Sequence, residues 1–162
     1  MSRLDSFIRR LSAQRDCLDH LIALLGERPG PVLELGLGNG RTFDHLRDRM
    51  PGRRIVVIER APDPHPACWP PDGDLIVGNL EDALPTALTT LGEPAVLVHS
   101  DIGTGEPERN ARVAGLLSQL LPPLLAEAAL IASDQALNHA SLVPLPAPGS
   151  VASDRYFLYR KS

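Results

Sequence analysis

The 162-residue chain is long enough to bury a hydrophobic core in one domain without disulfides or metal ions. Its 43% hydrophobic and 22% charged residues are typical of a globular protein, and its net charge of −4 gives no reason to expect nucleic acid or an anionic membrane as a partner. Cys17 and Cys68 have no metal-binding or redox spacing, so we expect reduced thiols and a cytoplasmic protein. No apolar run approaches the roughly 18 residues of a membrane-spanning helix.

The N-terminal segment predicts one long amphipathic helix. Apolar residues recur at helical spacing from Leu4 to Leu25, with polar side chains between them. Gly26 and the run Pro29-Gly30-Pro31 predict its end, so we assign residues 1–28 to this helix and residues 31–162 to the core of the same domain. Three roles are open to its apolar stripe: packing on the sheet, covering the active site, and forming a homodimer.

Short apolar segments that alternate with helical segments predict a parallel sheet. Strands buried on both faces read as continuous apolar runs, and such runs cover residues 32–35, 54–59, 74–77, 95–99 and 128–132. Five prolines in residues 61–73 predict a loop in place of a helix, and Pro122-Pro123 bends or breaks the last helix. Residues 141–145 and 156–160 predict an antiparallel hairpin at the sheet edge. The predicted fold is a Rossmann-like, doubly wound, mostly parallel α/β sheet with helices on both faces.

A glycine-rich turn follows the first strand, in the sequence Glu34-Leu35-Gly36-Leu37-Gly38-Asn39-Gly40. Sheets of this class bind ligands beyond the carboxyl ends of their strands, and glycines let the backbone approach a ligand closely. Glu59 ends the second strand about 20 residues on, where an acid can hold the hydroxyls of a ribose. The alternatives are a turn that only joins strand to helix and an acid that is only solvated.

These motifs resemble the class I S-adenosylmethionine-dependent methyltransferases. The family's first motif is an acid followed by three alternating glycines, and its second is an acid at the end of the second strand. Its third region resembles Gly78-Asn79-Leu80-Glu81-Asp82, and its fourth strand commonly ends in an acid, as here at Asp101. The dinucleotide fingerprint G-x-G-x-x-G has a different glycine spacing.

The resemblance implies a role for each matching position. S-adenosylmethionine would pass its methionine part over Gly36, Gly38 and Gly40, with Glu34 near the aminoacyl end. The nucleoside would contact Glu59 through its ribose and Asn79, Leu80, Glu81 and Arg60 through its adenine. Asp101 would face the methionine or the methyl acceptor, although an acid at that position can also cap the next helix.

The sulfonium of such a cofactor makes its methyl group electrophilic, so the protein need only align a nucleophile in line and exclude water. We therefore predict methyl transfer to a small-molecule acceptor. The candidate bases are His99, Asp101, Asp134 and His139, and we favour His99 and Asp101. A histidine suits this role because it titrates near neutrality. A hydrogen-bonded structural histidine is the alternative interpretation of His99.

Asp101, Asp134 and Gln135 follow the fourth and fifth strands. This is similar to catechol O-methyltransferase and its relatives, in which two acids and an amide at these strand ends bind magnesium. The amide there is usually Asn, so we favour metal-free binding of a substrate by these residues. Two further functions stay open: a non-catalytic S-adenosylmethionine-binding protein of the same fold, and an NAD(P)-dependent oxidoreductase.

Overall fold

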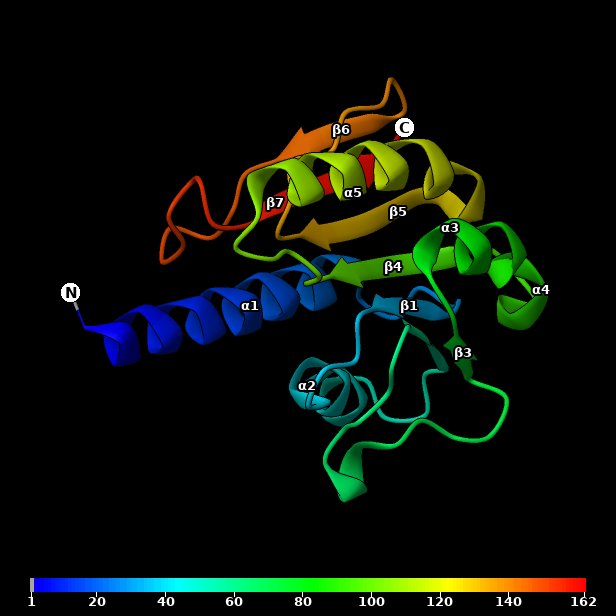
Figure 1. Ribbon diagram of the computed structural model, residues 1–162. Helices are drawn as coiled ribbons and strands as arrows, with labels where there is room; N and C mark the ends of the chain where they lie inside the picture. The colour runs from blue at the N-terminus through cyan, green and yellow to red at the C-terminus, as the bar shows by residue number, and fades with distance from the viewer. Residues whose placement is uncertain (1) are drawn as a thin grey trace.

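Seven strands form one sheet in the order β3-β2-β1-β4-β5-β7-β6 (Figure 1). The computed structural model describes residues 2–162. The first five strands are parallel, β7 runs antiparallel to β5, and β6 runs antiparallel to β7. The predicted mostly parallel sheet with a C-terminal hairpin is confirmed. The strands are β1 (Val32–Leu35), β2 (Ile55–Glu59), β3 (Leu75–Val77), β4 (Ala95–Ser100), β5 (Leu125–Ser133), β6 (Leu142–Leu145) and β7 (Phe157–Lys161).

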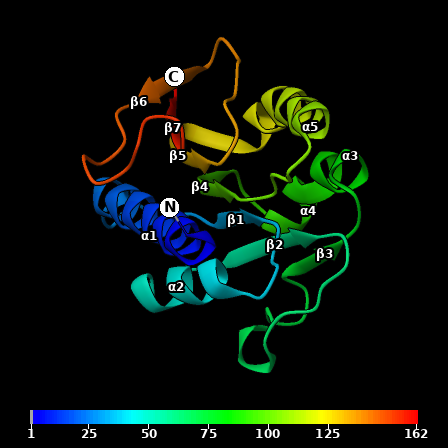
Figure 2. The ribbon, with the colours of Figure 1, turned by 60° about the vertical axis from the view of Figure 1, so that its left-hand side comes forward.

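Helices cover both faces of the sheet, as Figure 2 shows. On one face lie α1 (Arg3–Leu25) and α2 (Arg41–Arg49), and on the other lie α3 (Leu80–Ala83), α4 (Ala87–Leu91) and α5 (Pro107–Leu120). Each face has its own cluster of buried apolar side chains, because strands such as β1 and β4 are buried along their whole length. The sheet therefore separates two hydrophobic layers, as in other doubly wound folds.

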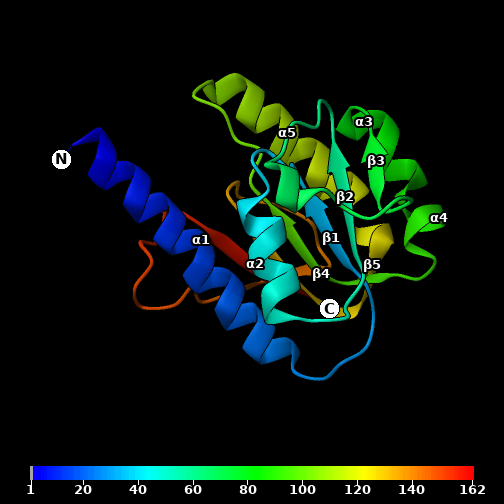
Figure 3. The same ribbon diagram turned by 90° about the horizontal axis from the view of Figure 1, so that it is seen from below.

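The predicted N-terminal helix is confirmed, and its two halves differ in surroundings. Ser2 and Asp5 form a reciprocal capping box at its start. Between Ala13 and Leu25 one face of the helix is buried against the sheet and Leu24 on the other face is exposed, whereas Leu4 and Ile8 are exposed where the helix extends beyond the rest of the molecule (Figure 3). Within residues 2–162, no helix has the length and apolarity needed to cross a membrane.

Prolines explain where the helices stop. Residues 61–73 contain only one short 3₁₀ turn, η1 (Pro66–Cys68), as their proline content predicts. Between α3 and α4 lies a second 3₁₀ turn, η2 (Leu84–Thr86), where Pro85 has no N–H to donate to a continuous helix. A third turn, η3 (Pro122–Leu124), separates α5 from β5, which begins at Leu125, earlier than predicted.

Candidate active site

Three cavities meet at the carboxyl ends of the parallel strands. The large cavity (about 740 Å³) lies between the β1–α2 turn, the ends of β2 and β3, and α5. The small cavity (about 160 Å³) lies between α1 and the β1–α2 turn, and the polar cavity (about 400 Å³) lies between α1, residues 103–105 and residues 154–156. Asp101 lines all three. The strand ends thus converge on one site, as expected for this class of sheet.

The large cavity contains most of the residues predicted to bind a cofactor. Its lining includes Gly36, Gly38, Glu59, Arg60, Asn79, Leu80, Glu81 and Asp101, so only Glu34 and Gly40 of the predicted set lie elsewhere. Its far wall is α5, with Arg109, Arg112, Val113 and Leu116. We did not predict this wall from the sequence, because only the fold brings α5 opposite β2. Its volume falls in the range of about 300–1,000 Å³ typical of ligand sites.

Glu59 binds the backbone of the glycine turn. Its Oε2 accepts hydrogen bonds from the N–H groups of Leu37 (2.8 Å) and Gly38 (3.2 Å), and its Oε1 accepts one from Ala61 (3.1 Å). Partial burial opposes ionisation of this carboxyl, but the backbone donors outweigh that effect and lower the pKa of Glu59. The acid is therefore a fixed anion that also shapes the turn.

The glycines of the turn serve different purposes. Gly36 has a φ of +85°, and a Cβ placed there would come within 2.5 Å of Ile102 Cγ2, so this glycine allows close approach of the loop after β4. Gly40 has a φ of +88°, and a Cβ there would overlap the Cβ of Cys68 in the proline-rich loop. Gly40, predicted to contact the cofactor, thus also lets this loop pack on the turn.

Glu34 and His99 form a buried pair between β1 and β4, where they are direct neighbours in the sheet. Both are 0% exposed, and His99 Nδ1 donates to Glu34 Oε2 at 2.8 Å. Thr42 Oγ1 donates to the other oxygen of Glu34, and His99 Nε2 lies 3.2 Å from Tyr156 Oη. Burial lowers the pKa of His99, but the charge and hydrogen bond of Glu34, together with the charges of Asp101 and Asp134, outweigh burial and raise this pKa overall.

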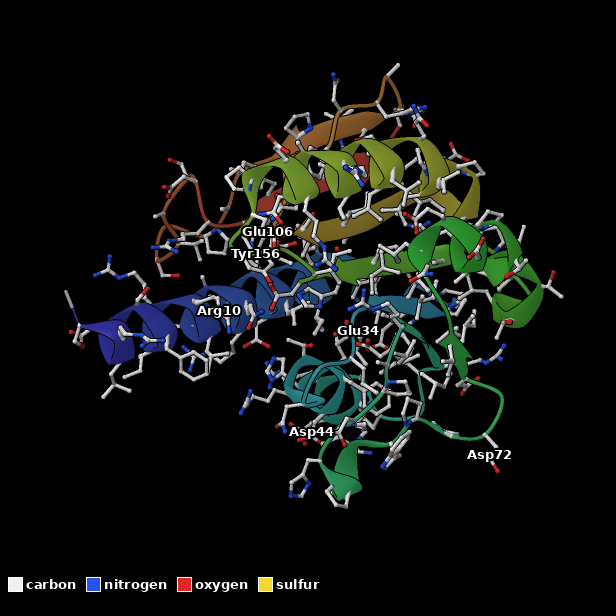
Figure 4. The ribbon with its side chains drawn as sticks, in the orientation of Figure 1. Arg10, Glu34, Asp44, Asp72, Glu106 and Tyr156 are labelled. Carbon is white, nitrogen blue, oxygen red and sulfur yellow. The ribbon has the colours of Figure 1, made fainter. Side chains whose placement is uncertain are left out.

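This pair bears on two expectations. His99 lines none of the three cavities and both of its ring nitrogens have partners inside the protein, an arrangement that favours the structural interpretation of this histidine. Glu34 is equally enclosed and lines none of these cavities itself. Figure 4 shows Glu34 beside β1, apart from Arg10 and Tyr156, which lie at the end of the sheet where the polar cavity opens.

Asp101, Asp134 and Gln135 do come together, in the lining of the polar cavity. Asp101 Oδ2 accepts a hydrogen bond from the buried Gln14, and Asp134 Oδ2 accepts one from the N–H of Gly103 at 2.7 Å. Burial raises the pKa of Asp101, and the nearby charge of Asp134 raises it further. The remaining lining consists of Arg10, Ala13, Gly103, Thr104, Gly105, Asp154, Arg155 and Tyr156.

Gln135 Nε2 lies 3.1 Å from Asp134 Oδ2, so the amide donates to the carboxylate. The other oxygen of Asp134 is buried and has no hydrogen-bond partner among the described residues. Across residues 2–162, no three His, Cys, Asp or Glu side chains are grouped so that they could hold a metal ion. Metal-free binding of a substrate by Asp101, Asp134 and Gln135 stays our prediction.

Comparisons with known proteins agree with this architecture. The model of a family described as S-adenosyl-L-methionine methyltransferase matches residues 1–161. An S-adenosyl-L-methionine methyl transferase from Silicibacter pomeroyi DSS-3 is 45% identical, with a TM-score of 0.92 over 100% of this chain and 99% of that one. No curated protein matches the sequence.

Two more distant structures share the fold alone. A proposed caffeoyl-CoA O-methyltransferase from Staphylococcus aureus is 12% identical (TM-score 0.61, covering 100% of this chain and 85% of that one). The proposed methyltransferase yhhF from Escherichia coli is 18% identical (TM-score 0.57, covering 92% and 86%). The family match over nearly the whole chain and the 45% identity lead to one conclusion: this chain belongs to the S-adenosyl-L-methionine methyltransferase family.

Proposed function

We propose that the large cavity binds the adenosyl part of S-adenosylmethionine and that the polar cavity binds a small methyl acceptor. The observation that carries this proposal is the position of Asp101, which lines both cavities and so marks where donor and acceptor meet. The family match favours this function over the two alternatives, a non-catalytic binding protein and an NAD(P)-dependent oxidoreductase.

Glu59 is the acid that we expect to meet the ribose. Its carboxylate lines the large cavity and is held in place by backbone N–H groups of the glycine turn and of the residues that follow Glu59. An anionic acceptor fixed in this way suits a hydroxyl donor. Leu80 and Ile102 offer apolar surface for the adenine in the same cavity.

The acceptor we propose is small and polar. Apart from Ala13 and two glycines, the residues that line the polar cavity carry charged or hydrogen-bonding side chains. When bound, the donor supplies an electrophilic methyl group. The protein then has to orient the acceptor atom and, where that atom carries a proton, receive the proton. Asp101 and Asp134 can do both, because they line the cavity and burial raises the pKa of Asp101, which makes this carboxylate a stronger base.

Titration calorimetry tests the donor site. We expect S-adenosylhomocysteine to bind and NAD not to bind, and Glu59→Gln to weaken S-adenosylhomocysteine by about 1–3 kcal/mol, because a charged acceptor of the ribose is lost. Glu93→Gln, an exposed acid far from the three cavities, is the control. Unchanged affinity in a folded Glu59→Gln variant would remove this residue from the site. Methyl release over a panel of small polar acceptors then separates an enzyme from a non-catalytic binder.

A further inference from the structure

The small cavity continues from the large one along the glycine turn. Gly36, Gly38 and Asp101 line both spaces, so a ligand whose adenosyl part occupies the large cavity has its other end directed toward the small one. The remaining lining comes from α1 (Arg10, Leu11, Gln14) and from residues 37–42. This volume of about 160 Å³ is thus built by the N-terminal helix and the start of α2 together.

Two arginines converge on this space and share one aromatic ring. The guanidinium carbon of Arg10 lies 5.4 Å from the ring centre of Phe7, and that of Arg41 lies 6.0 Å from the same centre. In the part of the chain that the structure describes, neither side chain forms an ion pair. Both side chains are exposed, so water and salt screen their mutual repulsion. An anion between the two guanidinium groups would gain from both charges at once.

The first turn of α2 adds to the positive potential. Arg41 is the first residue of this nine-residue helix, and no side chain caps its N-terminus. The first N–H groups of a helix have no partner within the helix, and the positive end of the helix dipole disfavours a cation at that position. The dipole of α2 therefore disfavours the positive charge of Arg41 at this position. Arg41 nevertheless lines the small cavity together with Arg10.

The lining of the small cavity also carries a negative charge, and the charge of Arg10 opposes the rise in the pKa of Asp101. Asp101 is the one carboxylate in the lining, and Gln14 holds it by a hydrogen bond to Oδ2. A ligand group that carries a carboxylate and an ammonium close together matches this arrangement: the carboxylate meets the two arginines and the ammonium meets Asp101.

We propose that Arg10 and Arg41, positioned by Phe7, bind the carboxylate of the methionine part of the donor, so that the N-terminal helix is a wall of the donor site. This assignment rests on the proposed function, which puts the adenosyl part in the large cavity. It gives α1 a role in ligand binding in addition to its packing on the sheet.

The experiment compares two ligands that share the adenosyl part and the sulfur. S-adenosylhomocysteine carries the amino-acid tail, whereas 5′-methylthioadenosine lacks it. Calorimetry with each ligand is performed on the wild type, Arg10→Gln, Arg41→Gln and Phe7→Leu. The matched control is Arg9→Gln, which changes the exposed neighbour of Arg10 that lines none of the cavities.

We expect Arg10→Gln and Arg41→Gln each to weaken S-adenosylhomocysteine roughly ten-fold, the effect of losing one charged hydrogen bond, and to leave 5′-methylthioadenosine unchanged. Phe7→Leu should weaken only the ligand with the tail, by about two- to five-fold, and Arg9→Gln should change neither. Equal loss of both ligands, or no loss of either, would overturn the assignment. If neither ligand binds the wild type, the proposed function is wrong as well. This outcome differs from equal loss of both ligands and from no loss of either, which would contradict the role of the two arginines alone.

Discussion

Removal of the His99 ring tests whether the buried Glu34 depends on it. His99→Leu substitutes an apolar side chain and leaves Glu34, which is 0% exposed, with Thr42 as its remaining side-chain partner. Removing one member of a buried ion pair costs about 3–5 kcal/mol, because the other charge stays buried without compensation. In a protein of this length, 1 kcal/mol corresponds to roughly 2–4 °C in Tm. We therefore expect Tm to fall by about 6–20 °C.

A double variant separates the buried charge from the lost packing. Glu34→Gln combined with His99→Leu removes the charge as well as its partner, so we expect it to be more stable than His99→Leu alone. Urea unfolding followed by circular dichroism measures both, with His139→Leu in an exposed loop as a control expected to stay within about 0.5 kcal/mol of the wild type. A loss below about 1 kcal/mol for His99→Leu, or a double variant less stable than the single one, would refute this reasoning.

Three further predictions concern Gly40 in the glycine turn, the carboxylate of Glu59, and the effect of chelation on methyl transfer. Gly40→Ala should cost about 1–3 kcal/mol from positive φ and overlap with Cys68, whereas Gly52→Ala, with a φ of +80° but open space around it, should show the backbone cost alone; urea midpoints measure both. The lowered pKa of Glu59 contributes stability that is complete above its unfolded pKa and lost as pH falls through the folded one, so Glu59→Gln should flatten the acid side of the stability–pH curve. Methyl transfer to an identified acceptor should survive thorough chelation; a loss restored by magnesium would contradict metal-free binding by Asp101 and Asp134.

Local patterns predicted the sheet and most of the large cavity. The run from Val32 to Leu35 is apolar apart from Glu34, and every residue of this strand is buried, as expected for a central parallel strand. Because parallel strands end at the same edge, the position of Glu59 at the end of β2 and of Asp101 after β4 was enough to bring both to one site. These predictions require only that a residue lies at the carboxyl end of a parallel strand. They do not require the order of the strands in the sheet.

The sequence patterns did not predict contacts that depend on the order of the strands in the sheet or on packing between segments far apart in the chain. Glu34 meets His99 because β1 and β4 are neighbours in the sheet, a pairing that no local pattern predicts. Gly40 matches the family motif, but its missing Cβ accommodates Cys68 from a loop more than one element away. Arg112 follows helical spacing on α5, and only the fold turns it toward the large cavity.

The N-terminal helix would contact both substrates under the two proposals made above. Arg10 lines the small and the polar cavities, and Asp101 lines these two and the large cavity. Groups shared by two sites respond to both ligands: an ammonium beside Asp101 relieves its repulsion from Asp134, and a carboxylate beside Arg10 reduces the positive charge that the acceptor meets. Coupling of this kind is reciprocal, so donor and acceptor affinities should depend on each other through these two side chains. A separate lid domain is not required for such communication, because one helix and one strand end already join the three cavities.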